Sequence, residues 1–446
     1  MKQKLRRLSM ILLLVLALTV SALAAQYSDI DSFDKLETAF ADNSGDTEIH
    51  ITLSGDINFA GVLFAQEGKT FYIDGKAYTL KDVFLSGAGT VNVDVKSIET
   101  PHNSAAIAAG GDVTVNITAD IKSEGAGVGA MDNAALTVNG SIESSEVGAV
   151  ALGNSEITVN GDITTKNDGV VAADASSVTV NGSVDASYGG VIANDSASAA
   201  VNGSVTSGTD GISANESAEI TVSGDVTAGG NGISARDDST VMVDGNVTSV
   251  NNSAPAEDGS LLGSNINTDP NLYSDGHDGI YAVDNANVTV SGDVTGSNAY
   301  GSWGYAGDGI YAEDTATVSV GGNATGGDVV ANPDLETTHN SAAGRGVNMD
   351  ATANVTVGGD AIGGSTNGKN GSGGSGAFIY LTLVPADDEE TKAGSLSVGG
   401  TARGGETLDK ENGKNGAGIQ FAENAQYGEN GELVIPDNTK QLTPEI

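Results

Sequence analysis

The sequence contains a phrase that returns again and again at one constant interval. "LTVNGSI" at 136–142 comes back as "ITVNGDI", "VTVNGSV" and "ITVSGDV". The glycine of this phrase recurs every 21 positions: Gly140, Gly161, Gly182, Gly203, Gly224 and Gly245. A second series with the same period stands 13 positions ahead of the first and opens the phrase Gly-apolar-x-Ala: Gly127, Gly148, Gly169, Gly190, Gly211 and Gly232. A fixed period of this kind indicates an array of equivalent structural units.

Asn-Gly between alternating apolar residues is also a strong signal for a β-hairpin. A hairpin array needs a second strand after Asn-Gly, yet only a pair such as "SV" or "DI" follows before Ser, Thr, Ala and Gly take over. A parallel solenoid needs short strands, corners and a constant coil length, because a slip of one residue turns inward side chains outward. We therefore predict an all-β fold, a parallel β-helix (β-solenoid) with coils of about 21 residues. We expect Asn-Gly to form a corner at which Gly takes a positive φ.

Alternation of apolar and polar residues assigns the faces of each coil. In one regular coil Ile157, Val159 and Ile163 alternate with polar residues and are predicted to face the core. Val170 and Ala172 are predicted to face it from the other side of the coil.

The coils change after residue 247. The two glycines of each pair keep their spacing of 13 positions, but the interval from one pair to the next grows from 8 positions to 34, 17, 24 and 17. Extra length on the same side of every coil places the loops side by side along one edge, often the binding face of a repeat protein. We predict five segments: a signal peptide at 1–25, an N-terminal cap with irregular first coils at 26–125, regular coils at 126–247, coils with insertions at one corner at 248–425, and a C-terminal strand or tail at 426–446. The cap includes a short helix with Phe33, Leu36 and Phe40 on one side.

The N-terminus and the charge suggest the location. A basic start, "MKQKLRR", an apolar run, "LSMILLLVLALTV", and the small residues of "SALAA" are typical of a secretory signal cleaved after Ala24 or Ala25. Removal of the signal peptide takes away four of the 19 Lys and Arg residues and leaves 15, against 59 Asp and Glu residues. The chain has no cysteine. So acidic a chain repels nucleic acid and anionic lipid. We expect no membrane insertion after cleavage and a protein that is secreted or held on the extracellular cell surface.

Together these features resemble the right-handed parallel β-helix superfamily of pectate-lyase-like proteins, over about residues 45–425. The phrases "VTVSGDVT", "GIYAVD" and "GIYAED" are similar to adhesin-like surface repeats of gut bacteria. The resemblance implies the fold, while the superfamily includes lyases, hydrolases, sugar-binding proteins and inert stalks.

The hydrolase branch of that superfamily uses clustered aspartates with a histidine and a basic residue. The chain has fragments of such a set: Asp237–Asp238, Asn267–Asp269, Gly276–Asp278 and Arg345. Paired carboxylates could act as acid and base, but these fragments occur in a different chain order, and two of them lie within one inserted loop. The lyase branch needs a basic catalyst, and the three arginines after the signal lack basic neighbours. We interpret the chain as a non-enzyme, with a polysaccharide-degrading β-helix enzyme (lyase or glycoside hydrolase) as the alternative.

An acidic residue stands five positions after the first glycine of most coils. Gly153 interrupts a series that is otherwise acidic: Asp132, Asp174, Asp195, Glu216, Asp237, Asp284 and Asp314. Stacked carboxylates ~4.8 Å apart repel by about 1 kcal/mol per neighbour, and Ca²⁺ would relieve that repulsion. We predict no cofactor other than Ca²⁺, with its site formed by Asp174, Asp195, Glu216 and Asp237. The alternative is that each side chain hydrogen-bonds its own turn in water.

Aromatic residues gather near the insertions. Tyr281 and Tyr311 hold the same outward position in successive coils and are predicted to stack, with Tyr300, Trp303 and Tyr305 in the insertion between them. Amphipathic rings on an exposed platform suit a sugar or a protein partner, and these five are the candidate carbohydrate-binding residues. The alternative is that the rings pack the loops against the rod. The sequence thus favours a structural, adhesin-like protein that binds a glycan or a surface protein through its inserted loops.

Overall fold

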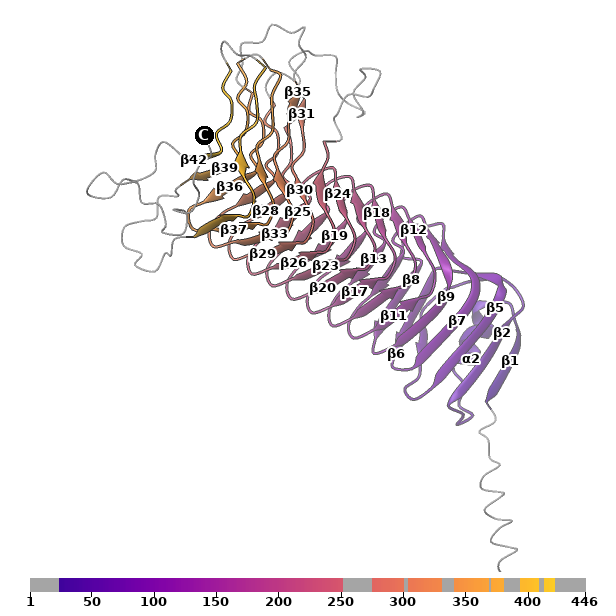
Figure 1. Ribbon diagram of the computed structural model, residues 1–446. Coiled ribbons are helices and arrows are strands. Elements are labelled where there is room, and N and C mark those ends of the chain that lie inside the picture. The colour runs from indigo at the N-terminus through magenta and orange to yellow at the C-terminus, as the bar shows by residue number, and fades with distance from the viewer. Residues whose placement is uncertain are drawn as a thin grey trace, which may run out of the picture.

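A computed structural model of the chain describes residues 24–251, 275–300, 304–330, 341–368, 370–380, 394–408 and 413–421. The strands wind into coils that stack in parallel along one axis and form a rod (Figure 1). This arrangement confirms the predicted parallel β-solenoid. Residues 1–23 of the expected signal peptide and the expected tail at 426–446 lie outside the described residues.

Each regular coil contains three short strands. In one coil these are β14 (Glu156–Val159), β15 (Ile163–Thr165) and β16 (Val170–Ala172). The first two strands of every coil belong to one large sheet, and the third belongs to a 14-stranded sheet. Every strand pairs in parallel with its counterpart in the next coil, for example Ile157 with Val178 and Val170 with Val191. Equivalent residues of successive regular coils therefore lie directly above one another.

The three series of strands have the following bounds. The other first strands are β11 (Ala135–Val138), β17 (Ser177–Val180), β20 (Ser198–Val201), β23 (Glu219–Val222), β26 (Thr240–Val243), β29 (Asn287–Val290), β33 (Thr317–Val320), β37 (Asn354–Val357) and β40 (Ser395–Val398). The other second strands are β12 (Ile142–Ser144), β18 (Val184–Ala186), β21 (Val205–Ser207), β24 (Val226–Ala228), β27 (Val247–Ser249), β30 (Val294–Thr295), β34 (Ala324–Thr325), β38 (Ala361–Ile362) and β41 (Ala402–Arg403). The other third strands are β4 (Leu63–Ala65), β6 (Val83–Gly87), β8 (Ile107–Gly111), β10 (Val128–Ala130), β13 (Ala149–Ala151), β19 (Val191–Ala193), β22 (Ile212–Ala214), β25 (Ile233–Ala235), β28 (Ile280–Ala282), β32 (Ile310–Ala312), β36 (Val347–Asp350), β39 (Ala377–Tyr380) and β42 (Ile419–Phe421).

The hydrophobic core is one continuous column inside the rod. The five residues assigned to it from alternation, Ile157, Val159, Ile163, Val170 and Ala172, are all fully buried. Each coil contributes only a thin apolar layer and buries it against the coils on either side, so the stability of one coil depends on its neighbours.

The N-terminal end of the rod is covered by a helix. Strand β1 (Ala25–Ile30) precedes α2 (Phe33–Phe40), in which Leu36 and Phe40 are buried. The ring of Phe40 stacks on Phe71 at 4.1 Å between centroids. This confirms the expected short helix.

The first coils use β2 (Glu48–Leu53) and β3 (Ile57–Asn58), followed by the long strands β5 (Thr70–Lys81), β7 (Thr90–Thr100) and β9 (Thr114–Ser123). Within the described residues, no helix has the length and apolarity needed to cross a membrane.

The Asn-Gly corner differs from its prediction in one respect. The glycines of this corner do not have a positive φ, so that expectation is wrong. Glycine is needed there because successive coils approach closely: a Cβ on Gly161 would lie 2.5 Å from the carbonyl oxygen of Gly140. The asparagines form a ladder of side-chain hydrogen bonds, in which Asn160 donates to Asn139 at 2.6 Å and Asn181 donates to Asn160 at 2.5 Å. The corner is thus held by contacts between coils.

The inserted segments form a second, smaller stack, which we call the fin: the described residues of 296–308, 326–345, 363–375 and 404–417. The fin rises from the C-terminal half of the rod (Figure 1). On its outgoing side β31 (Ala299–Tyr300) pairs in parallel with β35 (Val329–Val330). On its returning side single bridges join Tyr305 to Ala342 and Ala342 to Ser372. The insertions therefore continue the stacking of the coils beyond the rod.

In each insertion the chain leaves the rod along one side of the fin (the outgoing run) and comes back along the other side (the returning run). The two runs touch where the fin joins the rod, and we call this contact the glycine neck. Gly327 donates its N–H to the carbonyl of Gly307 at 2.8 Å, and Gly344 donates to Gly327 at 2.9 Å. The same alternation continues through Gly364, Gly374, Gly405 and Gly416. A Cβ on Gly326 of an outgoing run would overlap the carbonyl group of Gly344 on the returning run. A Cβ on Gly344 would overlap the carbonyl group of Gly307 on the preceding returning run. The runs can approach this closely because glycine stands at these positions.

Candidate functional site

The acidic residues of the predicted calcium site lie in the turn that follows each third strand. Asp174, Asp195, Glu216 and Asp237 all have a left-handed backbone, with φ between 56° and 63°. Gly153, which interrupts the acidic series, has a φ of 75° at the same position. Asp and Gly tolerate this conformation better than most residues do. Backbone geometry thus accounts for the alternation of Asp and Gly at this position.

The carboxylates of this turn bind the backbone of the preceding coil. Gly153 donates its N–H to Asp174 at 2.9 Å, and Asp174 donates its own N–H to Asp195 at 3.1 Å. Glu216 donates to Asp237 in the same way, at 3.2 Å. In the part of the chain that the structure describes, no three His, Asp or Glu side chains form a group able to hold a metal ion. Calcium binding at Asp174, Asp195, Glu216 and Asp237 stays a prediction.

Repulsion between the stacked charges can be measured at Glu216. The negative charge of Asp195 is the main cause that raises the pKa of Glu216 above its ordinary value. We expect Asp195→Asn to lower the pKa of Glu216, because the amide removes the charge while its oxygen still accepts the N–H of Asp174. An NMR titration of the Glu216 carboxyl checks this, with Asp185→Asn, an exposed acid on β18, as the control. A pKa of Glu216 that is the same in both variants would contradict the prediction.

A column of outward-facing aromatic rings lies on the third strands beside the fin. The rings of Tyr281 and Tyr311 stack at 5.2 Å between centroids with 6° between their planes, as expected from their equivalent positions. Tyr311 and Phe378 each lie 6.4 Å from Tyr380. We call Tyr281, Tyr311, Phe378 and Tyr380 the aromatic column.

Arginine side chains lie against two rings of the aromatic column, one at its N-terminal end and one within it. The guanidinium of Arg236 lies 4.9 Å from the ring centroid of Tyr281, and that of Arg345 lies 4.2 Å from Phe378. Tyr380 donates its hydroxyl to Tyr311 at 3.0 Å. Burial raises the pKa of the Tyr311 and Tyr380 hydroxyls, so both are neutral at pH 7. The column therefore combines ring faces, neutral hydroxyl groups and two guanidinium groups.

The other predicted aromatic residues lie elsewhere. Tyr300 is on β31 and Tyr305 is on the returning side of the fin, where 59% of its surface is exposed. Among the described residues, neither makes a ring contact with Tyr281 or Tyr311. Trp303 lies outside the described residues. Sequence reasoning missed Phe378, although it stands two positions after a first glycine, as Tyr281 and Tyr311 do.

A cluster of partly and fully buried charges lies at the junction of fin and rod. Asp308 is 8% exposed and accepts the backbone N–H of Arg345 and the amide of Asn348, both at 2.6 Å. Its carboxylate also lies 3.6 Å from the guanidinium of Arg345. In the coil before it, Asp278 accepts the N–H of Asp308 at 2.7 Å. Burial and then the charge of Asp308 raise the pKa of Asp278 to about 7. Burial also raises the pKa of Asp308, against the opposing effect of Arg345.

One hydrolase-like fragment belongs to this cluster. Gly276–Asp278 lies in no strand, as expected, but Asp278 stands two positions before β28 and donates its N–H to Asn231 at 2.9 Å. The fragment is held because each corner residue binds the equivalent residue of the adjacent coil. The structure brings Asp278 and Arg345 near Asp308, whereas Asp237–Asp238 begins in the acidic turn. Asn267–Asp269 lies outside the described residues.

Comparison with protein-family models, with curated proteins and with solved structures gave no match.

Proposed function

We propose that this protein is a secreted or cell-surface, adhesin-like structural rod that binds a glycan through the aromatic column. The observation that carries the proposal is the stack of Tyr281 on Tyr311, extended by Phe378 and Tyr380 along the outer face of the rod. Ring faces of this kind pack against the C–H groups of sugars, and tyrosine hydroxyls exchange hydrogen bonds with sugar hydroxyls.

The setting of the column supports binding along the rod. The rings are attached to strands whose register is fixed by backbone pairing, so little conformational entropy is lost when a ligand binds. Arg236 gives the column a cationic group at its N-terminal end within a strongly acidic protein, while Arg345 is ion-paired with Asp308. A glycan with a carboxylate or sulfate group would gain an ion pair at Arg236 and ring contacts along the column.

A glycan array tests the proposal. We expect the wild type to bind a subset of glycans and Tyr281→Ala to bind the same glycans at least about 10-fold more weakly, since buried aromatic anchors carry much of a binding energy. Tyr188→Ala is the matched control, because Tyr188 is 57% exposed but lies on the regular coils away from the column. Binding that Tyr281→Ala leaves unchanged, or that both variants reduce equally, would contradict the role of the column.

The same glycans distinguish the alternative function. Asp278 and Asp308 are carboxyl groups on adjacent coils next to Arg345, and the raised pKa of Asp278 suits a general acid. Release of reducing ends by the wild type, lost in Asp278→Asn, would favour a polysaccharide-degrading enzyme. Binding without release supports the adhesin-like function.

A further inference from the structure

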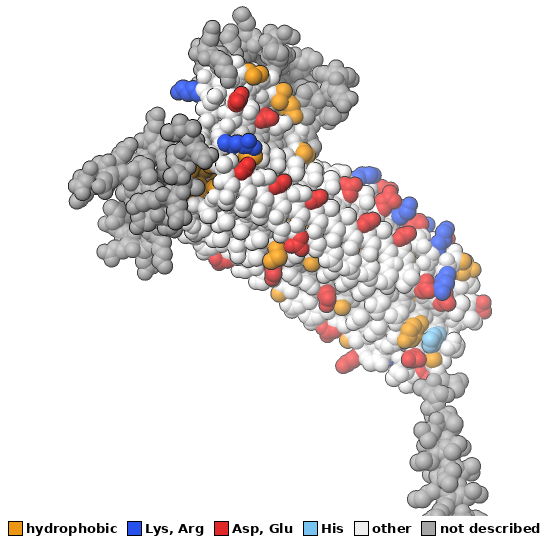
Figure 2. Space-filling view, in the orientation of Figure 1, with side chains coloured by type: hydrophobic (Ala, Val, Ile, Leu, Met, Phe, Trp, Pro, Cys, Tyr) orange, Lys and Arg blue, Asp and Glu red, His pale blue; other side chains and the backbone are white. Residues whose placement is uncertain are grey.

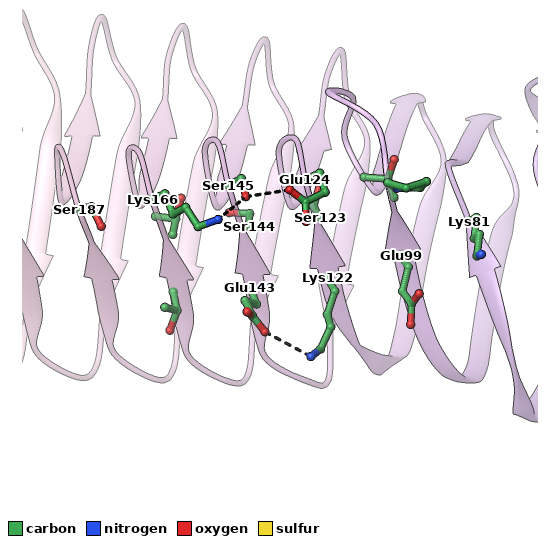
Figure 3. A pocket seen from close by; sticks show the side chains of 14 residues that line it. Lys81, Glu99, Lys122, Ser123, Glu124, Glu143, Ser144, Ser145, Lys166 and Ser187 are labelled. Carbon is green, nitrogen blue, oxygen red and sulfur yellow. Dashed lines mark hydrogen bonds and ion pairs between the residues drawn. The ribbon is translucent and has the colours of Figure 1, made fainter.

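A shallow hollow of about 450 Å³ lies on the N-terminal half of the rod (Figure 3). One wall is formed by outward side chains at the second strands of successive coils, which we call the charged ridge: Lys81, Glu99, Lys122 and Glu143. The opposite wall is formed by the turns that follow these strands and includes Glu124, Ser145 and Lys166. Hydroxyl side chains, including Ser123, Ser144 and Thr165, line the hollow between the two walls.

The sign of the charge alternates along the ridge. Backbone pairing aligns Lys81 with Glu99, Glu99 with Lys122, and Lys122 with Glu143. The ammonium of Lys122 lies 3.4 Å from the carboxylate of Glu143, yet these side chains remain 64% and 69% exposed. The ridge thus presents accessible charges of both signs. Figure 2 shows Lys and Arg side chains among Asp and Glu along this edge of the rod.

An alternating row of four charges has a symmetry that matters for association. A two-fold axis perpendicular to the row places Lys81 of one copy against Glu143 of the other, and Glu99 against Lys122. Every position then meets the opposite charge. Two copies side by side in the same direction would instead bring equal charges together. Isologous two-fold contacts are the commonest way in which identical chains associate.

We propose that the charged ridge is the docking surface for a second copy of this chain, with the two rods antiparallel about a two-fold axis. The axis that pairs Lys81 with Glu143 sets ridge against ridge, and the hollows of the two copies then face each other beside that contact. Contact between the ridges excludes water and strengthens ion pairs that are weak when exposed.

The charge of the whole chain makes this contact selective. The Asp and Glu side chains of the chain, 59 in all, repel a second copy in most orientations, since few basic residues remain after the signal. Three of these basic residues, Lys81, Lys122 and Lys166, line this one hollow. Like charges elsewhere therefore act against other arrangements of two copies. This inference does not depend on the proposed glycan binding.

Sedimentation equilibrium at about 0.15 M salt, where charges more than about 8 Å apart are largely screened, tests the proposal. We expect the wild type to form dimers and Lys122→Glu to raise the dissociation constant at least about 10-fold, because two contacts per dimer become repulsive. Lys414→Glu is the matched control: it makes the same change of net charge in the fin, away from the ridge. We expect it to dimerise as the wild type does.

A four-residue reversal gives the sharpest result. The variant Lys81→Glu, Glu99→Lys, Lys122→Glu, Glu143→Lys keeps the net charge and the alternation, so we expect it to dimerise with itself. In an antiparallel pair with the wild type its charges would oppose equal charges throughout, and only a parallel mixed pair would match. A wild type that stays monomeric at every concentration, a reversal variant that stays monomeric, or equal association of Lys122→Glu and Lys414→Glu would each overturn the proposal. A saccharide that binds the hollow of a monomeric protein would also overturn it.

Discussion

Replacing Gly344 with alanine is expected to destabilise the fin and the adjoining coils by about 3 kcal/mol or more. The added methyl group would overlap the backbone of Gly307 on the neighbouring returning run. Relief requires the successive returning runs to move apart at the glycine neck, which breaks the hydrogen bonds that Gly344 donates to Gly327 and that Gly364 donates to Gly344. Chemical denaturation gives the size of the loss, and hydrogen exchange of the amides in β32 and β36 locates it.

Gly129→Ala is the control for this experiment. Gly129 lies in β10, and the nearest atom to an added Cβ is the carbonyl oxygen of Ile107 at 4.0 Å. Alanine there is expected to leave stability unchanged or slightly higher, because it restricts the unfolded chain without a clash. If Gly344→Ala unfolds at the same denaturant concentration as Gly129→Ala, the two runs of the neck are not packed as closely as described.

Acidification from about pH 8 to about pH 5 is expected to stabilise the wild type relative to Asp278→Asn by about 3 kcal/mol. The pKa of Asp278 rises from its ordinary 3.8 to about 7 in the folded protein. The folded state therefore holds a proton that the unfolded chain has released. The stabilisation is complete below pH 3.8 and is lost as the pH rises through about 7. Asparagine can accept the same N–H from Asp308 and does not titrate in this range.

The comparison with Asp278→Asn isolates Asp278 together with its coupling to Asp308, whose charge raises the pKa of Asp278. Other carboxyl groups titrate with the opposite sign: hydrogen bonds and charge lower the pKa of Asp42 and Asp360, for example. Their effects are common to the two proteins and cancel in the difference. Urea unfolding at both pH values measures it, and equal pH dependence in wild type and variant would show that Asp278 ionises normally.

The fold could be predicted from the sequence because a constant period forces equivalent residues into register. The same counting places Tyr281 above Tyr311. Counting positions does not work where the coils differ in length. The numbers of residues from Lys81 to Glu99, to Lys122 and to Glu143 along the charged ridge are unequal, so only backbone pairing shows that these residues are aligned.

The glycine neck and the turn of the acidic series show a second limit. Gly307 and Gly344 each stand two positions before a first glycine, so counting places one above the other, but nothing in the sequence places the outgoing run against them. At the Asn-Gly corner the local signal was misleading. Conformational propensity favours a positive φ at such a glycine. The structure instead requires glycine there because a side chain would clash with the adjacent coil. The residues with a left-handed backbone are Asp174 and its equivalents in the other coils.

The interchangeable regular coils make the length of this molecule adjustable in steps. Because consecutive coils present the same edges to each other, a duplication or deletion of one whole regular coil would leave every remaining interface intact. Each such event would move the aromatic column by ~4.8 Å relative to the N-terminal helix. A change in the number of regular coils would therefore alter the reach of the protein without a change at either end.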